Sequence, residues 1–168
     1  FTWETNYNNN GYAVRQKNDG KFIISGATID TNIIIHPFII ELTPNGEVIY
    51  VNNYLDTLAN VTINDMKIGS NGSYAISGFT RNFIEDIAHS YFAFVTDDGD
   101  ITVSNVGNAT LEDNSFRSIY NPTNNTYTLV GEIIPTDPPG FDTSPYLMHL
   151  DGNGNQLWDT IYYQFDNN

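Results

Sequence analysis

The 168-residue sequence predicts an all-β protein made of three similar antiparallel sheets, and three observations lead to that prediction. Two landmarks recur along the chain at nearly constant spacing. Asn-Gly and Asp-Gly pairs follow short apolar runs, which is the strongest local signal for a β-hairpin. No stretch has the apolar spacing of a helix, and four prolines between positions 135 and 145 exclude one late in the chain.

The first landmark is an apolar run that follows a turn and ends in glycine. Its copies are residues 22–26, 74–78 and 127–131, with glycines 52 and 53 residues apart. The second landmark is an apolar run that leads into a turn; its copies are residues 38–42, 91–95 and 146–150. The turn glycines, Gly46, Gly99 and Gly154, lie 53 and 55 residues apart. A two-residue type I′ hairpin needs positive φ at both central residues, so we expect that turn and positive φ at these glycines.

Each repeat is predicted to contain four strands, with hairpin turns after the first and third and a longer loop after the second. We expect short first strands at residues 12–14, 63–68 and 115–120, and last strands at 48–54, 101–106 and 156–163. The middle strands carry apolar residues at consecutive positions, as expected of sheets covered on both faces. Six of these residues are predicted to be buried between sheets: Ile24, Ile76, Leu129, Ile40, Ala93 and Met148.

Four antiparallel strands in about 50 residues is the spacing of a β-propeller blade. We assign residues 8–56, 57–109 and 110–168 to three blades. Residues 1–7 are assigned to the outermost strand of a preceding blade, because the order Trp, Thr, Tyr in residues 3–7 recurs in residues 158–162. Closed propellers have about four to eight blades, so these three are expected to be part of a larger or oligomeric propeller. A start at Phe1, without Met or a signal peptide, predicts an excerpt of a longer protein.

Residues 19–26 (DGKFIISG) and 146–158 (YLMHLDGNGNQLW) resemble a bacterial repeat of the form DGGYIVxG followed by YLxKLDxNGNxLW. That repeat occurs in secreted and surface-anchored bacterial proteins and is similar to quinoprotein-like and seven-bladed repeat families. The resemblance covers essentially the whole chain and implies propeller blades and an extracellular location. It implies no catalytic residue, because the shared residues are structural. The quinoprotein docking pattern is missing, so no quinone cofactor is implied.

The chain is acidic, with a formal net charge of −14 from 20 acidic and six basic residues. Nucleic-acid binding needs clustered Lys and Arg, so this composition argues against it and against binding to anionic membranes. There is no cysteine, which excludes disulfides and thiolate metal sites. No apolar run approaches the roughly 18 residues of a spanning helix, so we expect no membrane insertion.

Binding residues are expected in the loops between second and third strands, residues 27–37, 80–90 and 132–145, because these differ most between the repeats. The candidates are His36, Arg81, Glu85, Asp86, His89, Asp137, Phe141 and Asp142. His36 and His89 are equivalent in the repeat and therefore a whole blade apart, too far to share one metal ion. The expected partners are a protein or carbohydrate ligand, or further blades of the same protein.

Two turns have the oxygen-rich composition that calcium prefers. Their candidate ligands are Asp97, Asp98, Asp100, Asp151 and Asn153. Neither turn has the spacing of an EF-hand or its late Glu. The property that these turns share with the third copy is the hairpin itself, so we expect no cofactor, with calcium as the alternative.

The sequence favours a non-catalytic binding, adhesive or structural module of a secreted or cell-surface bacterial protein. One alternative is a segment of an exported propeller enzyme whose catalytic residues lie on blades outside this chain. Another is a repeat subunit of an extracellular filament or oligomer. No nucleophile elbow of the form Gly-x-Ser-x-Gly occurs. An enzyme would need polar residues that converge at the central channel, and the predicted first strands supply few of them.

Overall fold

The computed structural model describes residues 8–29, 31–53, 60–69, 74–82, 87–96, 101–105, 112–134 and 143–162. These residues form β-strands and no helix, and therefore none that could cross a membrane. The strands are β1 (Asn8–Gln16), β2 (Phe22–Ile29), β3 (Ile35–Leu42), β4 (Val48–Asn53), β5 (Asn60–Ile68), β6 (Tyr74–Asn82), β7 (Ile87–Val95), β8 (Ile101–Asn105), β9 (Glu112–Asn121), β10 (Thr126–Ile134), β11 (Ser144–Leu150) and β12 (Gln156–Ile161).

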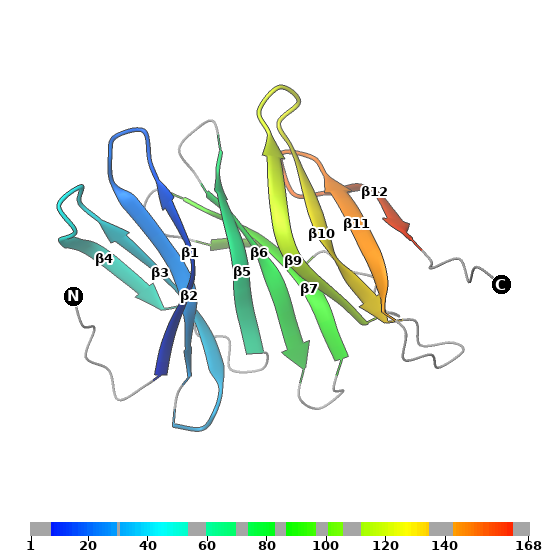
Figure 1. The fold of residues 1–168 in the computed structure, drawn as a ribbon, viewed down its shortest axis with the longest axis horizontal. Helices are drawn as coiled ribbons and strands as arrows, with labels where there is room; N and C mark the ends of the chain where they lie inside the picture. Colours follow the sequence, from blue (N-terminus) through cyan, green and yellow to red (C-terminus); the bar gives the residue numbers. More distant parts are fainter. Residues whose placement is uncertain are drawn as a thin grey trace.

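The strands form three four-stranded sheets, each a simple antiparallel meander: β1 to β4, β5 to β8 and β9 to β12. Figure 1 shows the three sheets side by side in chain order. They meet through their first strands, since β5 packs on β1, β2 and β3, and β9 packs on β5, β6 and β7. The all-β prediction with three antiparallel sheets is therefore confirmed. The described sheets do not close into a ring.

Two apolar clusters fill the spaces between the sheets. In the first cluster, Ile23 and Ile39 of the first sheet meet Tyr74 and Ile76 of the second. In the other, Ala75 and Phe92 of the second sheet meet the third sheet. Because neighbouring residues of a strand point to opposite faces, consecutive apolar residues in β6 and β7 cover both faces of the middle sheet. This explains why the apolar pattern of the middle strands does not alternate.

The predicted core register is confirmed at five of its six residues. Ile76 pairs with Ala93 and Leu129 pairs with Met148, and all four are at most 2% exposed. Ile40 is also buried. Ile24 is only half-buried, so its prediction is wrong. Ile24 is equivalent to Ile76 and Leu129, which pack on the preceding sheet, and no described sheet precedes the first one.

Three hairpin turns share one geometry. After β3, the Gly46 N–H donates to the Thr43 carbonyl at 2.9 Å and the Thr43 N–H donates to the Glu47 carbonyl at 2.8 Å. The turns at Gly20 and Gly154 repeat both bonds, and the three glycines have φ between 85° and 89°. These are three-residue loops that end in a glycine bulge, not the predicted two-residue type I′ turns, because the residue before Gly46 does not take positive φ. Positive φ is thus confirmed at Gly46 and Gly154, while Gly99 lies outside the described residues.

An irregularity in the first strands explains the glycine of the first landmark. One residue is left unpaired in each first strand: Tyr12, Asn64 and Phe116. The bulge brings backbone close to the second strand. A Cβ on Gly26 would overlap the Asn10 carbonyl oxygen, and a Cβ on Gly78 would overlap the Thr62 carbonyl oxygen. Glycine is therefore needed at these positions for a close approach between strands.

The strands extend beyond the predicted limits. The first strands have nine or ten residues, more than predicted. β2 and β3 pair as far as Ile29 and Ile35, and β6 and β7 pair as far as Asn82 and Ile87. The loops predicted at residues 27–37 and 80–90 are therefore shorter than expected, because their β-branched and aromatic flanks continue the ladder.

Candidate functional site

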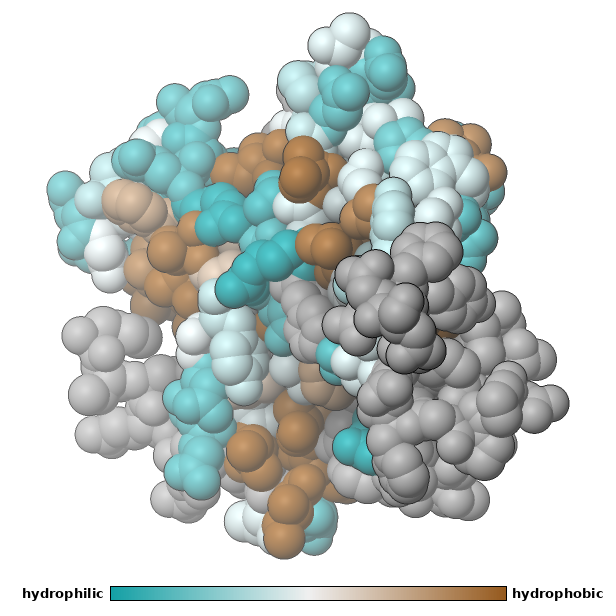
Figure 2. Space-filling model, turned by 45° about the vertical axis from the view of Figure 1, so that its right-hand side comes forward, coloured by the Kyte–Doolittle hydropathy of each residue, from teal (hydrophilic) through white to brown (hydrophobic). Residues whose placement is uncertain are grey.

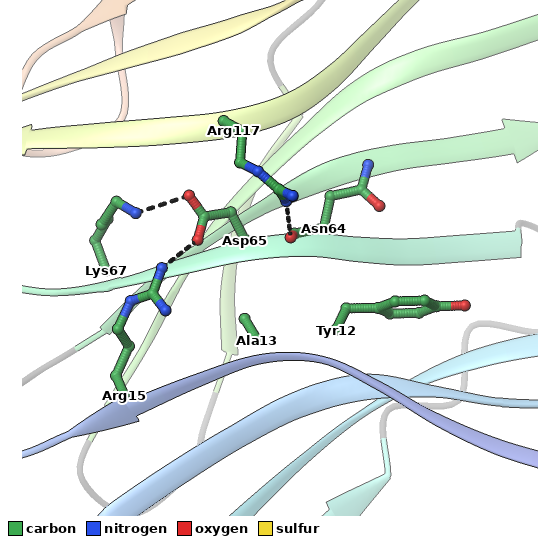
Figure 3. Close-up of a pocket in the computed structure, with 7 residues that line it drawn as sticks. All are labelled: Tyr12, Ala13, Arg15, Asn64, Asp65, Lys67 and Arg117. Carbon is green, nitrogen blue, oxygen red and sulfur yellow. Dashed lines mark hydrogen bonds and ion pairs between the residues drawn. The ribbon is translucent and has the colours of Figure 1, made fainter.

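The first strands of the three sheets converge on a polar pocket of about 300 Å³ (Figure 3). It is lined by Tyr12, Ala13 and Arg15 of β1, by Asn64, Asp65 and Lys67 of β5, and by Arg117 of β9. The lining includes the bulge residues of β1 and β5 and the residue that follows each bulge. The bulges thus occur where the three sheets meet, and they shape this pocket.

Asp65 connects the three sheets. Its Oδ1 accepts hydrogen bonds from Arg15 Nη2 of the first sheet at 2.6 Å and from the Met66 N–H at 2.8 Å. Its Oδ2 accepts from Lys67 Nζ at 2.7 Å and from the Ser118 N–H of the third sheet at 3.0 Å. The carboxylate is almost fully buried, at 4% exposure of the side chain. Four donors on two oxygens satisfy a buried carboxylate, which would otherwise be costly.

The environment keeps Asp65 ionised. Burial raises the pKa of this carboxyl, but the hydrogen bonds from Lys67 Nζ and from the Ser118 and Met66 N–H groups lower it further, so that the net pKa lies below its ordinary value. A carboxylate with a low pKa and four occupied acceptor sites is a poor proton carrier near neutral pH. The pocket therefore favours binding over acid–base chemistry.

Positive charge is concentrated at the pocket in a strongly acidic chain. Arg15, Lys67 and Arg117 are three of the six basic residues, and Asp65 is the single carboxylate among the lining residues. Arg117 reaches across from β9, and its Nη1 donates to the Asn64 carbonyl at 2.8 Å. Arg15 and Arg117 are joined to different groups, so two guanidinium groups border the same space (Figure 3). Such a pocket is suited to an anionic ligand group, because guanidinium groups match carboxylates well.

A second polar cluster lies between the first two sheets and is structural. Buried Glu41 is approached by Lys21 Nζ at 3.1 Å and by Lys17 Nζ at 3.8 Å. Lys17 also lies over the Tyr74 ring, 5.5 Å from its centroid, and the hydroxyls of Tyr74 and Tyr50 are 3.0 Å apart. Burial, followed by the hydrogen bond with Tyr74, raises the pKa of Tyr50. These groups use their polar atoms on one another, at the contact between the two sheets.

The predicted binding residues lie away from the pocket. His36 and His89 occupy equivalent places inside β3 and β7, opposite Thr28 and Thr80, and not before the strands as expected. Arg81 is exposed on β6. The remaining binding candidates lie outside the described residues: Glu85, Asp86, Asp137, Phe141 and Asp142. None of the three described candidates lines the pocket.

The described calcium candidates belong to a hairpin turn. The Asp151 carboxylate accepts from the Asn153 N–H at 2.8 Å and from the Asn155 N–H and side-chain amide, each at 2.9 Å. These bonds, led by the side-chain amide of Asn155, lower the pKa of Asp151. Asp97, Asp98 and Asp100 lie outside the described residues. In the part of the chain that the structure describes, no group of three or more His, Asp or Glu side chains is placed to hold a metal ion.

The sequence reasoning missed the pocket, and the expectation that the first strands supply few converging polar residues was wrong. A signal was available in the positions of the basic residues. Arg15, Lys67 and Arg117 are separated by 52 and 50 residues, close to the repeat length, so one cation falls near the same place in each repeat. The bulges were not foreseen, and the short first strands that were predicted left Arg15 outside its strand.

Comparison with known proteins adds no relative. A scan against protein-family models and a search of the curated proteins both gave no match to this chain. The resemblance to bacterial surface repeats therefore remains a prediction from the two landmarks.

Proposed function

We propose that this chain is a non-catalytic binding module, made of β-propeller blades, of a secreted or cell-surface bacterial protein. The observation that carries the binding role is the meeting of Arg15, Lys67 and Arg117 around buried Asp65, where all three sheets come together. The extracellular location and an adhesive role rest on the repeat resemblance described above.

The propeller arrangement is supported by the way in which the sheets pack. Each sheet is a four-stranded meander, and the first strand of one sheet packs on the first three strands of the sheet before it. In a propeller, the first strand of each blade lies nearest the central channel. The pocket, which lies between β1, β5 and β9, would then border that channel, a common place for ligands.

The ligand is proposed to be a carbohydrate that carries a carboxylate. A volume of about 300 Å³ is at the small end of ligand pockets and suits one sugar residue. The guanidinium groups of Arg15 and Arg117 would bind the carboxylate. The Tyr12 ring, 46% exposed at the pocket wall, offers an apolar surface with a polar tip for the sugar.

The test is a titration of the isotope-labelled protein with glucuronate, followed by NMR, with glucose as the uncharged comparison. Glucuronate is expected to shift the amides of β1, β5 and β9, and glucose is expected to bind more weakly. Arg117→Gln removes one cation while Asp65 keeps its four partners, and it should weaken glucuronate binding about tenfold or more. Arg81→Gln is the matched control, because Arg81 is exposed outside the pocket. Equal binding of the two sugars, or equal effects of the two variants, would overturn the proposal.

A further inference from the structure

The two outer sheets each have a face that is covered in the other repeats. On β2, β6 and β10, residues Ile24, Ile76 and Leu129 are equivalent, and the last two pack on the sheet before them. The face of the first sheet that carries Ile24 is its end face. On the third sheet, Thr128 and Leu147 occupy the places of Ala75 and Phe92, which pack on the sheet after them. That side of the third sheet is the other end face.

The end face of the first sheet exposes a residue that is buried in the other repeats. Val14 pairs with Ile24, as Met66 pairs with Ile76 and Ser118 pairs with Leu129. Met66 is 0% exposed and Ser118 is 2% exposed, whereas Val14 is 54% exposed. The difference follows from the place of the sheet in the stack and not from the type of residue, since valine is well suited to burial.

The end face of the third sheet is apolar and open. Ile119, Thr128, His149 and Trp158 pair in one row across the sheet. Ile119 is 65% exposed, Trp158 is 47% exposed, and neighbouring Val130 is 38% exposed. Figure 2, in which the side that carries the third sheet in Figure 1 is turned forward, shows hydrophobic side chains in contact with solvent between hydrophilic ones.

Ile119 also replaces a charge. It pairs with Thr128 as Arg15 pairs with Ile23 and Lys67 pairs with Ala75, so it takes the place of a cation that is bonded to Asp65 in the other two repeats. An isoleucine that replaces such a cation and is 65% exposed points to an apolar partner.

We propose that the first sheet of one copy of this chain packs on the third sheet of a second copy, in a head-to-tail arrangement. The contacts inside the chain define the geometry. Since β5 packs on β1, β2 and β3, and β9 packs on β5, β6 and β7, β1 of the second copy would pack on β9, β10 and β11. Val14 would then be covered by Ile119 and Val130. Two copies joined in this way at both ends contain six sheets, within the range of about four to eight for closed propellers; a contact that does not close produces a filament.

Salt is expected to strengthen this association. Each copy carries a formal charge of −14, so two copies repel each other at low ionic strength. Screening at physiological salt shortens the range of that repulsion to about 8 Å. The apolar contact depends little on screening, so the association should increase as salt rises.

The experiment is light scattering behind size exclusion, at low and physiological salt, on the parent and three variants. The parent is expected to exceed the monomer mass of 18.8 kDa at physiological salt. Val14→Asp and Ile119→Asp should each be monomeric, because each variant damages one side of every head-to-tail contact. Ile33→Asp is the matched control: Ile33 is 78% exposed in the connection before β3 and should leave the mass unchanged. Unchanged circular dichroism establishes that the variants fold.

Mixing the two disruptive variants decides the arrangement. The Val14→Asp copy keeps an intact third sheet and the Ile119→Asp copy keeps an intact first sheet, so the mixture should recover one good contact and form a 1:1 dimer. A contact between two identical faces would instead be broken by only one of the variants. A parent that stays monomeric at both salt concentrations, a loss of association in only one variant, or a mixture that stays monomeric would each overturn the proposal. The glucuronate titration of the monomeric variants tests the proposed function separately, because neither residue lines the pocket.

Discussion

Replacement of Asp65 by Asn tests the central role of this side chain in joining the three sheets. The substitution keeps the shape of the side chain but removes its charge and turns one acceptor into a donor. The Asn amide would face either Arg15 or Lys67, both of which are donors without acceptor capacity. One buried cationic contact and one backbone N–H bond are therefore lost or weakened.

The expected cost can be worked from burial. Removing one partner of a buried ion pair costs about 3–5 kcal/mol. Asp65 is buried, but Arg15 and Lys67 are 36% and 25% exposed, so water compensates part of their loss. The lower end of the range, about 3 kcal/mol, is the better expectation. For a chain of this size, that corresponds to a fall in Tm of about 6–12 °C.

The pH dependence follows from the lowered pKa. A carboxyl whose pKa is lower in the folded than in the unfolded protein stabilises the fold above the unfolded pKa, and loses that contribution as the pH falls through the folded pKa. The difference in Tm between the parent and Asp65→Asn should therefore be constant above about pH 5 and should shrink below the unfolded value of about 3.9. Scanning calorimetry at several pH values measures this difference, with Glu47→Gln as a control in which an exposed carboxylate is removed. An equal difference at pH 7 and pH 3, or a Tm like that of the control, would refute the reasoning.

Three further substitutions test the packing and the turns by thermal denaturation. Gly78→Ala should cost about 1–3 kcal/mol, because its Cβ would overlap the Thr62 carbonyl oxygen; an unchanged Tm would contradict the close approach. Leu129→Ala should cost about 2–5 kcal/mol, and Ile24→Ala should cost clearly less because Ile24 is half-buried; equal losses would contradict the assigned faces. Ile33→Asn should stabilise the protein by about 1 kcal/mol, because Ile33 has φ of 66° and is 78% exposed; a lower Tm would show that its side chain makes a contact worth more than the strain.

Strand pairing could be predicted from the sequence because it depends on local and repeated signals. The pairs Ile76–Ala93 and Leu129–Met148 follow from the two landmarks, which fix the register of the second and third strands in each repeat. The turn type was wrong because Asn-Gly suits two turn geometries. The sequence contains the glycine that both geometries need, and only the hydrogen bonds from Thr43 and Gly46 distinguish a three-residue loop from a two-residue one.

The exposure of Ile24 could not be predicted from its own repeat, because its side chain and strand match those of Ile76 and Leu129. Burial at this position depends on whether another sheet lies against it, which is a property of the whole stack. The pocket was missed for a related reason. It is formed by residues from three repeats, and the bulges at Tyr12 and Asn64 displace the following side chains from the regular alternation on which the prediction relied.

The repeats divide packing and binding between different strands. The second and third strands keep the same apolar register in all three copies, because both of their faces are needed between sheets. The residue after the bulge, in contrast, is Ala13, Asp65 or Arg117. At the place where the sheets meet, a side chain can change from apolar to acidic to basic while the strand pairing on either side of it is kept. A ligand site built from these residues can therefore differ between related chains without any change in the strands that hold the sheets together.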